Sequence, residues 1–323
     1  MSRDEGPISI QRTPGGSQII AIGGGKGGIG KSLVSASIAI GLAQLGQRVV
    51  VIDADLGGAN LHTCLGIEPP KVTLSDFLDK RVERIEEVIV PTNIPGLGLI
   101  SGALDVAAAA NPKYSQKLRL LKEIARLSAD VVLIDLGAGT AFNTLDFFLI
   151  ADAGIVCTTP EPTAVENAYR FIKAAFFRRM KNLEVAYGIR PLVEQLMAER
   201  DQRMIRTPVD LIRQVKAHDP RKGAALEEEI RHTQVRLLIN QIRTPEDAQL
   251  GVNMRSVCSK YFGISVDVLG QIPYDNLVWQ AVRKRQPLLL ASPESAAAQA
   301  LRVIAAKLVP QRQESLAHEG ALL

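Results

Sequence analysis

The chain has few of the residues that build disulfide frameworks, zinc sites or base-stacking surfaces. Its 323 residues include only three cysteines, Cys64, Cys157 and Cys258, which lie far apart and form no Cys-x-x-Cys pair. This spacing excludes a disulfide framework and a cysteine zinc site, and it favours inert thiols in a reducing compartment. Aromatic residues make up only 4% of the chain, which argues against a surface that stacks the bases of single-stranded nucleic acid.

Long hydrophobic runs are also absent. The sequence contains no apolar stretch of about 20 residues that could span a membrane. Its first residues, "MSRDEGPISIQRTPGG", lack the apolar core of a signal peptide. We therefore expect a cytoplasmic protein, and a location at a cell pole or at the membrane periphery stays open. The net charge of +4 permits contact with DNA or anionic lipid and requires neither.

Short apolar runs alternate with helical patterns along most of the chain. The runs are rich in Val, Ile and Leu on consecutive positions, as in strands that are covered on both faces. The alternation predicts an α/β fold, with an open, mostly parallel twisted sheet and helices on both faces. The predicted strands are 18–23, 48–55, 97–102, 130–137, 153–160, 236–242 and 266–273, and the clearest helical patterns are 32–46 and 113–128.

One domain accounts for this pattern. We expect it to cover residues 18–309, with a flexible lead-in at 1–17 and a flexible tail at 310–323. Residues 178–233 interrupt the alternation, because they have helical spacing and mixed charge but no strand pattern. They predict a helical insertion or lid.

A glycine-rich segment matches the phosphate-loop pattern G-x-x-x-x-G-K-[ST] between a predicted strand and a predicted helix. Glycines let backbone N–H groups turn toward a polyphosphate, and the start of the helix attracts the same anion. Lys31 is expected to reach the β- and γ-phosphates, and Ser32 to ligate Mg²⁺. The residues expected to hold the nucleotide here are Gly25, Lys26, Gly27, Gly28, Ile29, Gly30, Lys31, Ser32 and Leu33.

Two further predicted strands end in carboxylates. Asp53 and Asp55 end one strand, and Asp135 ends another. Carboxylates at strand ends face the ligand crevice of an open α/β sheet. The apolar run before Asp135 is typical of a Walker B segment that binds Mg²⁺ through water. Gly137 and Gly139 are expected to form a loop that senses the γ-phosphate.

The second lysine of the phosphate loop sharpens the pattern to K-G-G-x-G-K-S. With "DADLGGANLH", "LGAGT", "TTPEPTA" and "IPYD", it resembles the deviant Walker A proteins of the MinD/ParA family. The resemblance is closest to the MinD-like flagellar-number regulators, FlhG/FleN. It implies that Lys26 crosses the interface of an ATP-bound dimer to the partner's phosphates. It also implies that Asp53 holds Mg²⁺ through water and that Asp55 orients or activates the attacking water, so that Lys26, Lys31 and Asp55 are the catalytic set.

The same resemblance suggests a base pocket. Asn240 would hydrogen-bond adenine and Pro273 would pack on its face, with Tyr274 and Asp275 beside it. The chain has no N-K-x-D guanine motif, so ATP is favoured over GTP as the nucleotide.

These features predict an ATP-dependent dimerisation switch that hydrolyses ATP slowly, is stimulated by a protein partner, and positions or counts a flagellum, a pole or the division machinery. A ParA-like partition ATPase that binds nonspecific DNA and a non-hydrolysing adaptor stay open as alternatives. The tail "VPQRQESLAHEGALL" has too little apolar face for a membrane anchor. An iron–sulfur carrier role lacks its cysteine pair.

Overall fold

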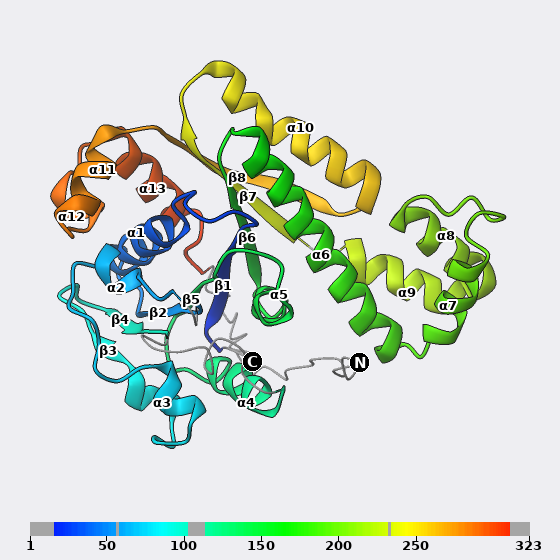
Figure 1. Cartoon of the computed structure of the whole chain (residues 1–323), viewed down its shortest axis with the longest axis horizontal. Coiled ribbons are helices and arrows are strands. Elements are labelled where there is room, and N and C mark those ends of the chain that lie inside the picture. The colour runs from blue at the N-terminus through cyan, green and yellow to red at the C-terminus, as the bar shows by residue number, and fades with distance from the viewer. Residues whose placement is uncertain (1–15, 56–57, 103–113, 232–233, 311–323) are drawn as a thin grey trace, which may run out of the picture.

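An eight-stranded sheet runs through the protein (Figure 1). The computed structural model describes residues 16–55, 58–102, 114–231 and 234–310, so the predicted lead-in and tail lie almost entirely outside the described residues. The strand order is β3-β4-β2-β5-β1-β6-β7-β8, and every neighbouring pair is parallel except β3 and β4. The strands are β1 (Gln18–Gly23), β2 (Val49–Asp53), β3 (Val90–Pro91), β4 (Leu97–Ile100), β5 (Val131–Asp135), β6 (Ala153–Thr158), β7 (Gln234–Ile242) and β8 (Ser265–Pro273).

All seven strands predicted from the apolar runs are confirmed, and so is the fold class. The central strands β1, β2, β5 and β6 are buried at almost every position. That burial explains why their sequences are continuously apolar rather than alternating. The antiparallel edge strand β3 was not predicted, because two residues carry no readable pattern.

Helices cover both faces of the sheet. One hydrophobic cluster packs α1 and α13 on one face, and a second packs α4, α5, α6 and α10 on the other. Among the described residues no helix has both the length and the apolar composition that crossing a membrane requires. The helices are α1 (Lys31–Gln44), α2 (Leu61–Cys64), α3 (Leu74–Leu78), η1 (Ile85–Val88, 3₁₀), α4 (Tyr114–Ile124), α5 (Phe142–Leu149), α6 (Pro162–Ala186), α7 (Arg190–Ala198), α8 (Pro208–His218), α9 (Pro220–Arg231), α10 (Pro245–Phe262), α11 (Asn276–Arg283), α12 (Leu288–Ala291) and α13 (Ala296–Ala306).

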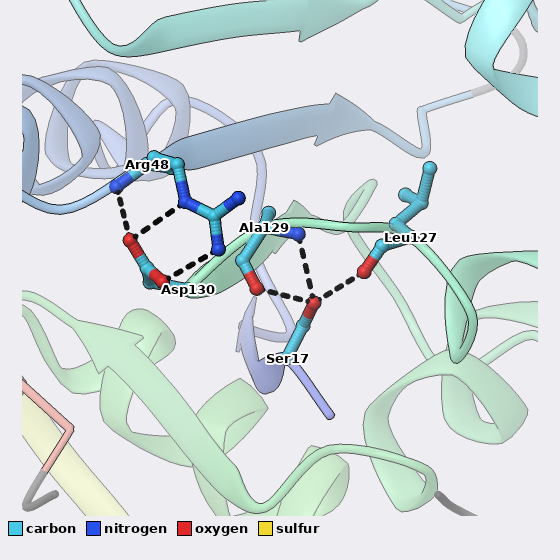
Figure 2. A network of polar contacts seen from close by, with 5 residues as sticks. All are labelled: Ser17, Arg48, Leu127, Ala129 and Asp130. Carbon is cyan, nitrogen blue, oxygen red and sulfur yellow. Dashed lines mark hydrogen bonds and ion pairs between the residues drawn. The ribbon is translucent and has the colours of Figure 1, made fainter. Parts of the chain in front are cut away.

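Polar contacts fix the edge of the sheet where β1, β2 and β5 begin (Figure 2). The Ser17 hydroxyl lies 2.5 Å from the carbonyl oxygen of Leu127 and 2.7 Å from that of Ala129. Asp130 accepts hydrogen bonds from the backbone N–H of Arg48 at 2.8 Å and from its guanidinium at 2.9 and 3.2 Å. These contacts set the three strands in register, so that their opposite, carboxyl ends meet at one place.

The segment predicted as a helical insertion consists, where it is described, of helices joined by short turns and one longer non-helical stretch, 199–207. Residue 178 lies inside α6, a helix of 25 residues, and α7, α8 and α9 follow it before β7. These three helices lie together beside the second half of α6, on the side of the molecule away from α11 and α12 (Figure 1). The start of α8 has a capping box, in which Thr207 accepts a hydrogen bond from the backbone N–H of Asp210 and Asp210 accepts one in return.

Candidate nucleotide site

The loop between β1 and α1 adopts backbone angles that side chains rarely tolerate. Gly28 and Gly30 have φ values of 77° and 88°. At Gly25 the constraint is contact, because a Cβ built there would lie 2.1 Å from the carbonyl oxygen of Asn167 on α6. These glycines let the loop curl over the start of α1, where unpaired N–H groups and the helix dipole favour an anion.

The two lysines of the loop point to different partners. Lys31 is 8% exposed, and its Nζ donates to the backbone carbonyl of Lys26 at 3.1 Å. The Lys26 side chain turns instead toward the start of α6. Its Nζ forms an ion pair with Glu161 at 2.7 Å and donates to the Thr163 hydroxyl at 3.1 Å. The Lys31 side chain therefore lies over its own loop, whereas the Lys26 side chain lies at the surface.

Asp53 and Asp135 lie side by side at the ends of β2 and β5, directly opposite each other in the strand register. Both are 1% exposed. Asp53 accepts hydrogen bonds from the backbone N–H groups of Asp55 and Leu61 at 3.1 and 3.0 Å. Asp135 accepts one from the hydroxyl of Ser35 on α1 at 2.7 Å. Sequence reasoning missed Ser35, although its spacing of three residues after Ser32 places it on the same face of the helix.

Burial makes both carboxyl groups harder to ionise. It raises the pKa of Asp53 to about 6 and, together with repulsion from Asp53, the pKa of Asp135 to about 7. Hydrogen bonds from Ser35 and Ser32 act in the opposite direction on the pKa of Asp135. Two buried carboxylates beside serine hydroxyls are oxygen donors of the kind that Mg²⁺ prefers, and a divalent cation would offset both charges. The residues present therefore fit the ion.

The raised pKa values predict that, without nucleotide or metal, the protein loses stability as pH rises. Each carboxyl binds its proton more tightly when folded, so its stabilisation is complete below the unfolded pKa of 3.8 and is lost as pH rises through about 6 to 7. Asp135→Asn should remove the part of this dependence that comes from Asp135, leave the part that comes from Asp53, and exceed the wild type in free energy of unfolding at about pH 8, by on the order of 1–2 kcal/mol.

Urea unfolding in EDTA at about pH 5 and about pH 8 measures this difference. Glu166→Gln, on the exposed surface of α6, is the matched control and should follow the wild type at both pH values. Equal stability of Asp135→Asn and wild type at the higher pH would contradict the prediction.

Asp55 lies against the loop that follows β5. A Cβ built at Gly137 would lie 3.2 Å from the Asp55 carboxyl group, so a larger residue there would require the Asp55 side chain to shift by a few tenths of an ångström. The backbone N–H of Gly139 donates to the carbonyl of Gly24 in the phosphate loop at 3.3 Å. The loop after β5 thus touches both the phosphate loop and Asp55. A ligand bound to the phosphate loop would therefore change the contacts of the loop after β5.

Asn240 is buried beneath the phosphate loop. Its Nδ2 donates to the carbonyl of Ile29 at 2.9 Å, and its Oδ1 accepts from the backbone N–H of Gln241 at 3.0 Å. Gln241 has a φ of 62°, a strained angle for a residue with a side chain. Asn240 therefore ties the end of β7 to the phosphate loop, and an adenine contact for it stays a prediction.

The other residues predicted for the base pocket lie in and just after the end of β8. Pro273 is aligned with Ile242 across the β7–β8 pair. Tyr274 is stacked by the guanidinium of Arg243, 3.8 Å from the ring centroid. Asp275 caps α11 by accepting the backbone N–H of Leu277 at 2.9 Å. The Asp275 carboxylate thus has a structural role, and contacts of these residues with a base stay predictions.

Comparison with known proteins identifies the family. Residues 16–190 match the family model described as ParA, NUBPL iron-transfer P-loop NTPase. The chain is a P-loop NTPase of the ParA/MinD family. The match covers the sheet from β1 through β6, the phosphate loop, Asp53 and Asp135. It ends at the start of α7, so most of the insertion lies outside it.

Three relatives show how far the likeness extends. The chain is 27% identical to the antiactivator FleN of Pseudomonas aeruginosa, over 90% of this chain and 86% of FleN. It is 34% identical to the flagellum site-determining protein YlxH of Helicobacter pylori, over 58% of this chain and 63% of YlxH. Its fold is similar to that of the septum site-determining protein MinD complexed with Mg-ADP from Pyrococcus horikoshii, with a TM-score of 0.60 and 22% identity over 95% of this chain and 100% of MinD.

The cysteines of this ParA/MinD-family chain do not form a cluster site. Cys157 and Cys258 are buried in opposite hydrophobic clusters, and burial raises the pKa of their thiols to about 12 and about 11. Within the described residues no group of three His, Cys, Asp or Glu side chains could hold a metal ion. The description of the family model mentions iron transfer. The described part of this chain has no cysteine site for iron.

Proposed function

We propose that this protein is an ATP-driven dimerisation switch that positions or counts a cellular structure. One observation carries the proposal: the phosphate loop, Lys31 and the paired carboxylates of Asp53 and Asp135 converge at the carboxyl ends of β1, β2 and β5. This convergence suits a nucleoside triphosphate and Mg²⁺. The relatives named for flagellar and septum placement, YlxH and MinD, support the cellular role.

Each side chain has a part in this mechanism. Lys31 would leave the Lys26 carbonyl to bind the β- and γ-phosphates. Ser32, Asp53 and Asp135 would hold Mg²⁺, which when bound offsets the charge on the phosphate oxygens. Asp55 would orient the attacking water, because it lies against the loop after β5 that the γ-phosphate would reach.

Lys26 is available to a second subunit. In the single chain its Nζ rests on Glu161, and the two side chains are 36% and 60% exposed. An exposed ion pair of this kind contributes about 0–1 kcal/mol, so releasing it costs little. The phosphates of a partner subunit would offer Lys26 a stronger contact in a site from which water is excluded. Hydrolysis would then depend on dimerisation.

Size-exclusion chromatography with light scattering tests the switch. The wild type should be a monomer with ADP and a dimer with ATP and Mg²⁺. Asp55→Ala should keep ATP intact and accumulate the dimer, and the double variant Lys26→Ala/Asp55→Ala should return to a monomer. Lys222→Ala, which removes an exposed lysine of α9 in the insertion, is the matched control and should leave the dimer unchanged.

A monomer in every condition, with ATP binding retained, would refute the dimerisation switch and favour the non-hydrolysing adaptor. A dimer that forms equally well without Lys26 would show that this lysine has no cross-subunit role.

The DNA-binding alternative finds less support in the insertion. Most of its arginines are neutralised by carboxylates on the same helices or on their neighbours. The pairs are Arg178–Asp146, Arg179–Glu229, Arg190–Glu194, Arg203–Glu199 and Arg213–Asp210. A DNA-binding face needs cations that are free to meet phosphates.

A further inference from the structure

The insertion, α6 and the end of α10 together line an apolar cavity of about 370 Å³ that is open to solvent and that the nucleotide chemistry does not use. The cavity lies between the second half of α6, α7, the start of α8 and the end of α10, with the 199–207 segment at its opening. Its volume is within the range of small-molecule sites.

The floor of the cavity is buried and its walls are exposed. Phe176, Met180 and Val193 form part of the floor and are 3–6% exposed. Phe177 and Met197 line the walls, with exposures of 44% and 42%. Large apolar side chains that stay this exposed around a hollow are typical of a binding surface. Methionine adapts its shape to what it contacts, so Met180 and Met197 suit a flexible apolar ligand.

Positive charge surrounds the opening. Lys181, Arg200 and Arg206 line it, against one carboxylate, Glu184. Arg206 forms no ion pair with any described residue, and Arg200 reaches only Asp201, at 3.7 Å, a side chain that is 97% exposed. The neighbouring insertion arginines are well paired, as described above. The opening is therefore the one part of the cavity lining that favours an anionic group.

A single helix joins this cavity to the phosphate loop. The first turns of α6 carry Glu161 as N-cap and Asn167, which contact Lys26 and Gly25. Its second half carries Phe176 and Met180, which line the cavity. The distance from Asn167 to Met180 is roughly 20 Å along the helix axis. The cavity is thus built onto an element that belongs to the nucleotide site.

We propose that this cavity binds a single-chain amphipathic carboxylate, with its acyl body against Phe176, Met180 and Met197 and its head group at Arg206. The lining favours this chemistry over a nucleotide or a sugar. Apart from the charged residues, Thr207 and Tyr261 are the polar residues of the lining, and the Thr207 hydroxyl is already bonded to Asp210 in the capping box, so few polar groups remain to recognise a polar ligand. Binding at this site does not depend on the proposed ATPase switch, so the two can fail separately.

Isothermal titration calorimetry of the full chain with dodecanoate, below its micelle-forming concentration, tests the proposal. We expect one site per chain and little binding of dodecyltrimethylammonium, which has the same chain length and the opposite charge. Arg206→Glu should weaken dodecanoate binding about tenfold. Met197→Glu, which places a carboxylate on the exposed wall, should weaken it further. Both positions are exposed, so both variants should keep the fold, as circular dichroism can verify.

Arg213→Glu is the matched control, because Arg213 lies on α8 outside the cavity and is paired with Asp210. It should bind dodecanoate like the wild type. Three outcomes would overturn the proposal: no saturable binding of dodecanoate, binding that neither cavity variant weakens, or equal binding of the cationic amphiphile. Binding to phosphatidylglycerol vesicles without binding of free dodecanoate would also overturn it and assign the surface to membrane lipid.

Discussion

Replacing Lys31 with alanine is expected to lower the rate of ATP hydrolysis by about a hundredfold or more. Lys31 is almost fully buried and reaches over the loop to the carbonyl of Lys26. With ATP bound, the ammonium group would meet charge that develops on the phosphates in a site with little water, where one such contact contributes about 3–4 kcal/mol to the transition state. Phosphate release under saturating ATP and Mg²⁺ measures the loss.

The control for this prediction is the neighbouring lysine. Lys26→Ala should retain ATP binding by the monomer, because the Lys26 side chain rests on Glu161 and Thr163 rather than on its own loop. Lys31→Ala should lose most of that binding, measured by equilibrium dialysis with labelled ATP. Equal ATP affinity in the two variants, or hydrolysis by Lys31→Ala within a few-fold of wild type, would contradict the assignment.

Removing the carboxylate of Asp146 is expected to cost about 3–5 kcal/mol in free energy of unfolding. Asp146 is buried on α5 between two cations from other helices. It accepts the Lys117 ammonium of α4 at 2.6 Å and two hydrogen bonds from the Arg178 guanidinium of α6 at 2.9 and 3.1 Å. Asp146→Ala would leave both cations buried beside each other without this carboxylate, and the loss should be visible in urea unfolding.

Two further variants separate charge from packing. Glu166→Ala removes a carboxylate that pairs with Arg170 on the exposed face of α6, and it should cost under about 0.5 kcal/mol. The triple variant Lys117→Met/Asp146→Leu/Arg178→Met should recover most of the stability that Asp146→Ala loses, because it leaves no buried charge. A loss below about 1 kcal/mol for Asp146→Ala would show that water reaches the cluster.

Local patterns in the sequence were sufficient to predict most of the sheet and the phosphate loop. Buried parallel strands require apolar residues on both faces, and this requirement makes the seven longer strands readable without any tertiary information. The start of α1 at Lys31 follows from the loop motif in the same way. The pairing of Asp53 with Asp135 was implied by their positions at strand ends, although only the strand order makes them neighbours.

Contacts between distant segments were not predictable. Residues 178–233 were predicted as a helical insertion of mixed charge, but α6 places Arg178, the first of them, in the core on Asp146, 32 residues away in the chain. The contact of the Asn240 amide with the Ile29 carbonyl, across 211 residues, was not predicted either, and the predicted contact of Asn240 with a base stays a prediction. Neither partner leaves a periodic signal in the sequence, because each contact depends on how whole elements pack.

The path of the chain from β6 to β7 has a consequence for how this protein can diverge. These two strands are adjacent and parallel, so the chain must leave the sheet and return to it, and the length of that excursion is set by neither strand. Helices α7, α8 and α9 occupy the excursion and share their apolar core with α6. Mutation, lengthening or exchange of this module of three helices can therefore give a lineage a new recognition specificity. The register of the sheet, and the ATPase chemistry proposed at the opposite edge of the sheet, then stay under separate selection.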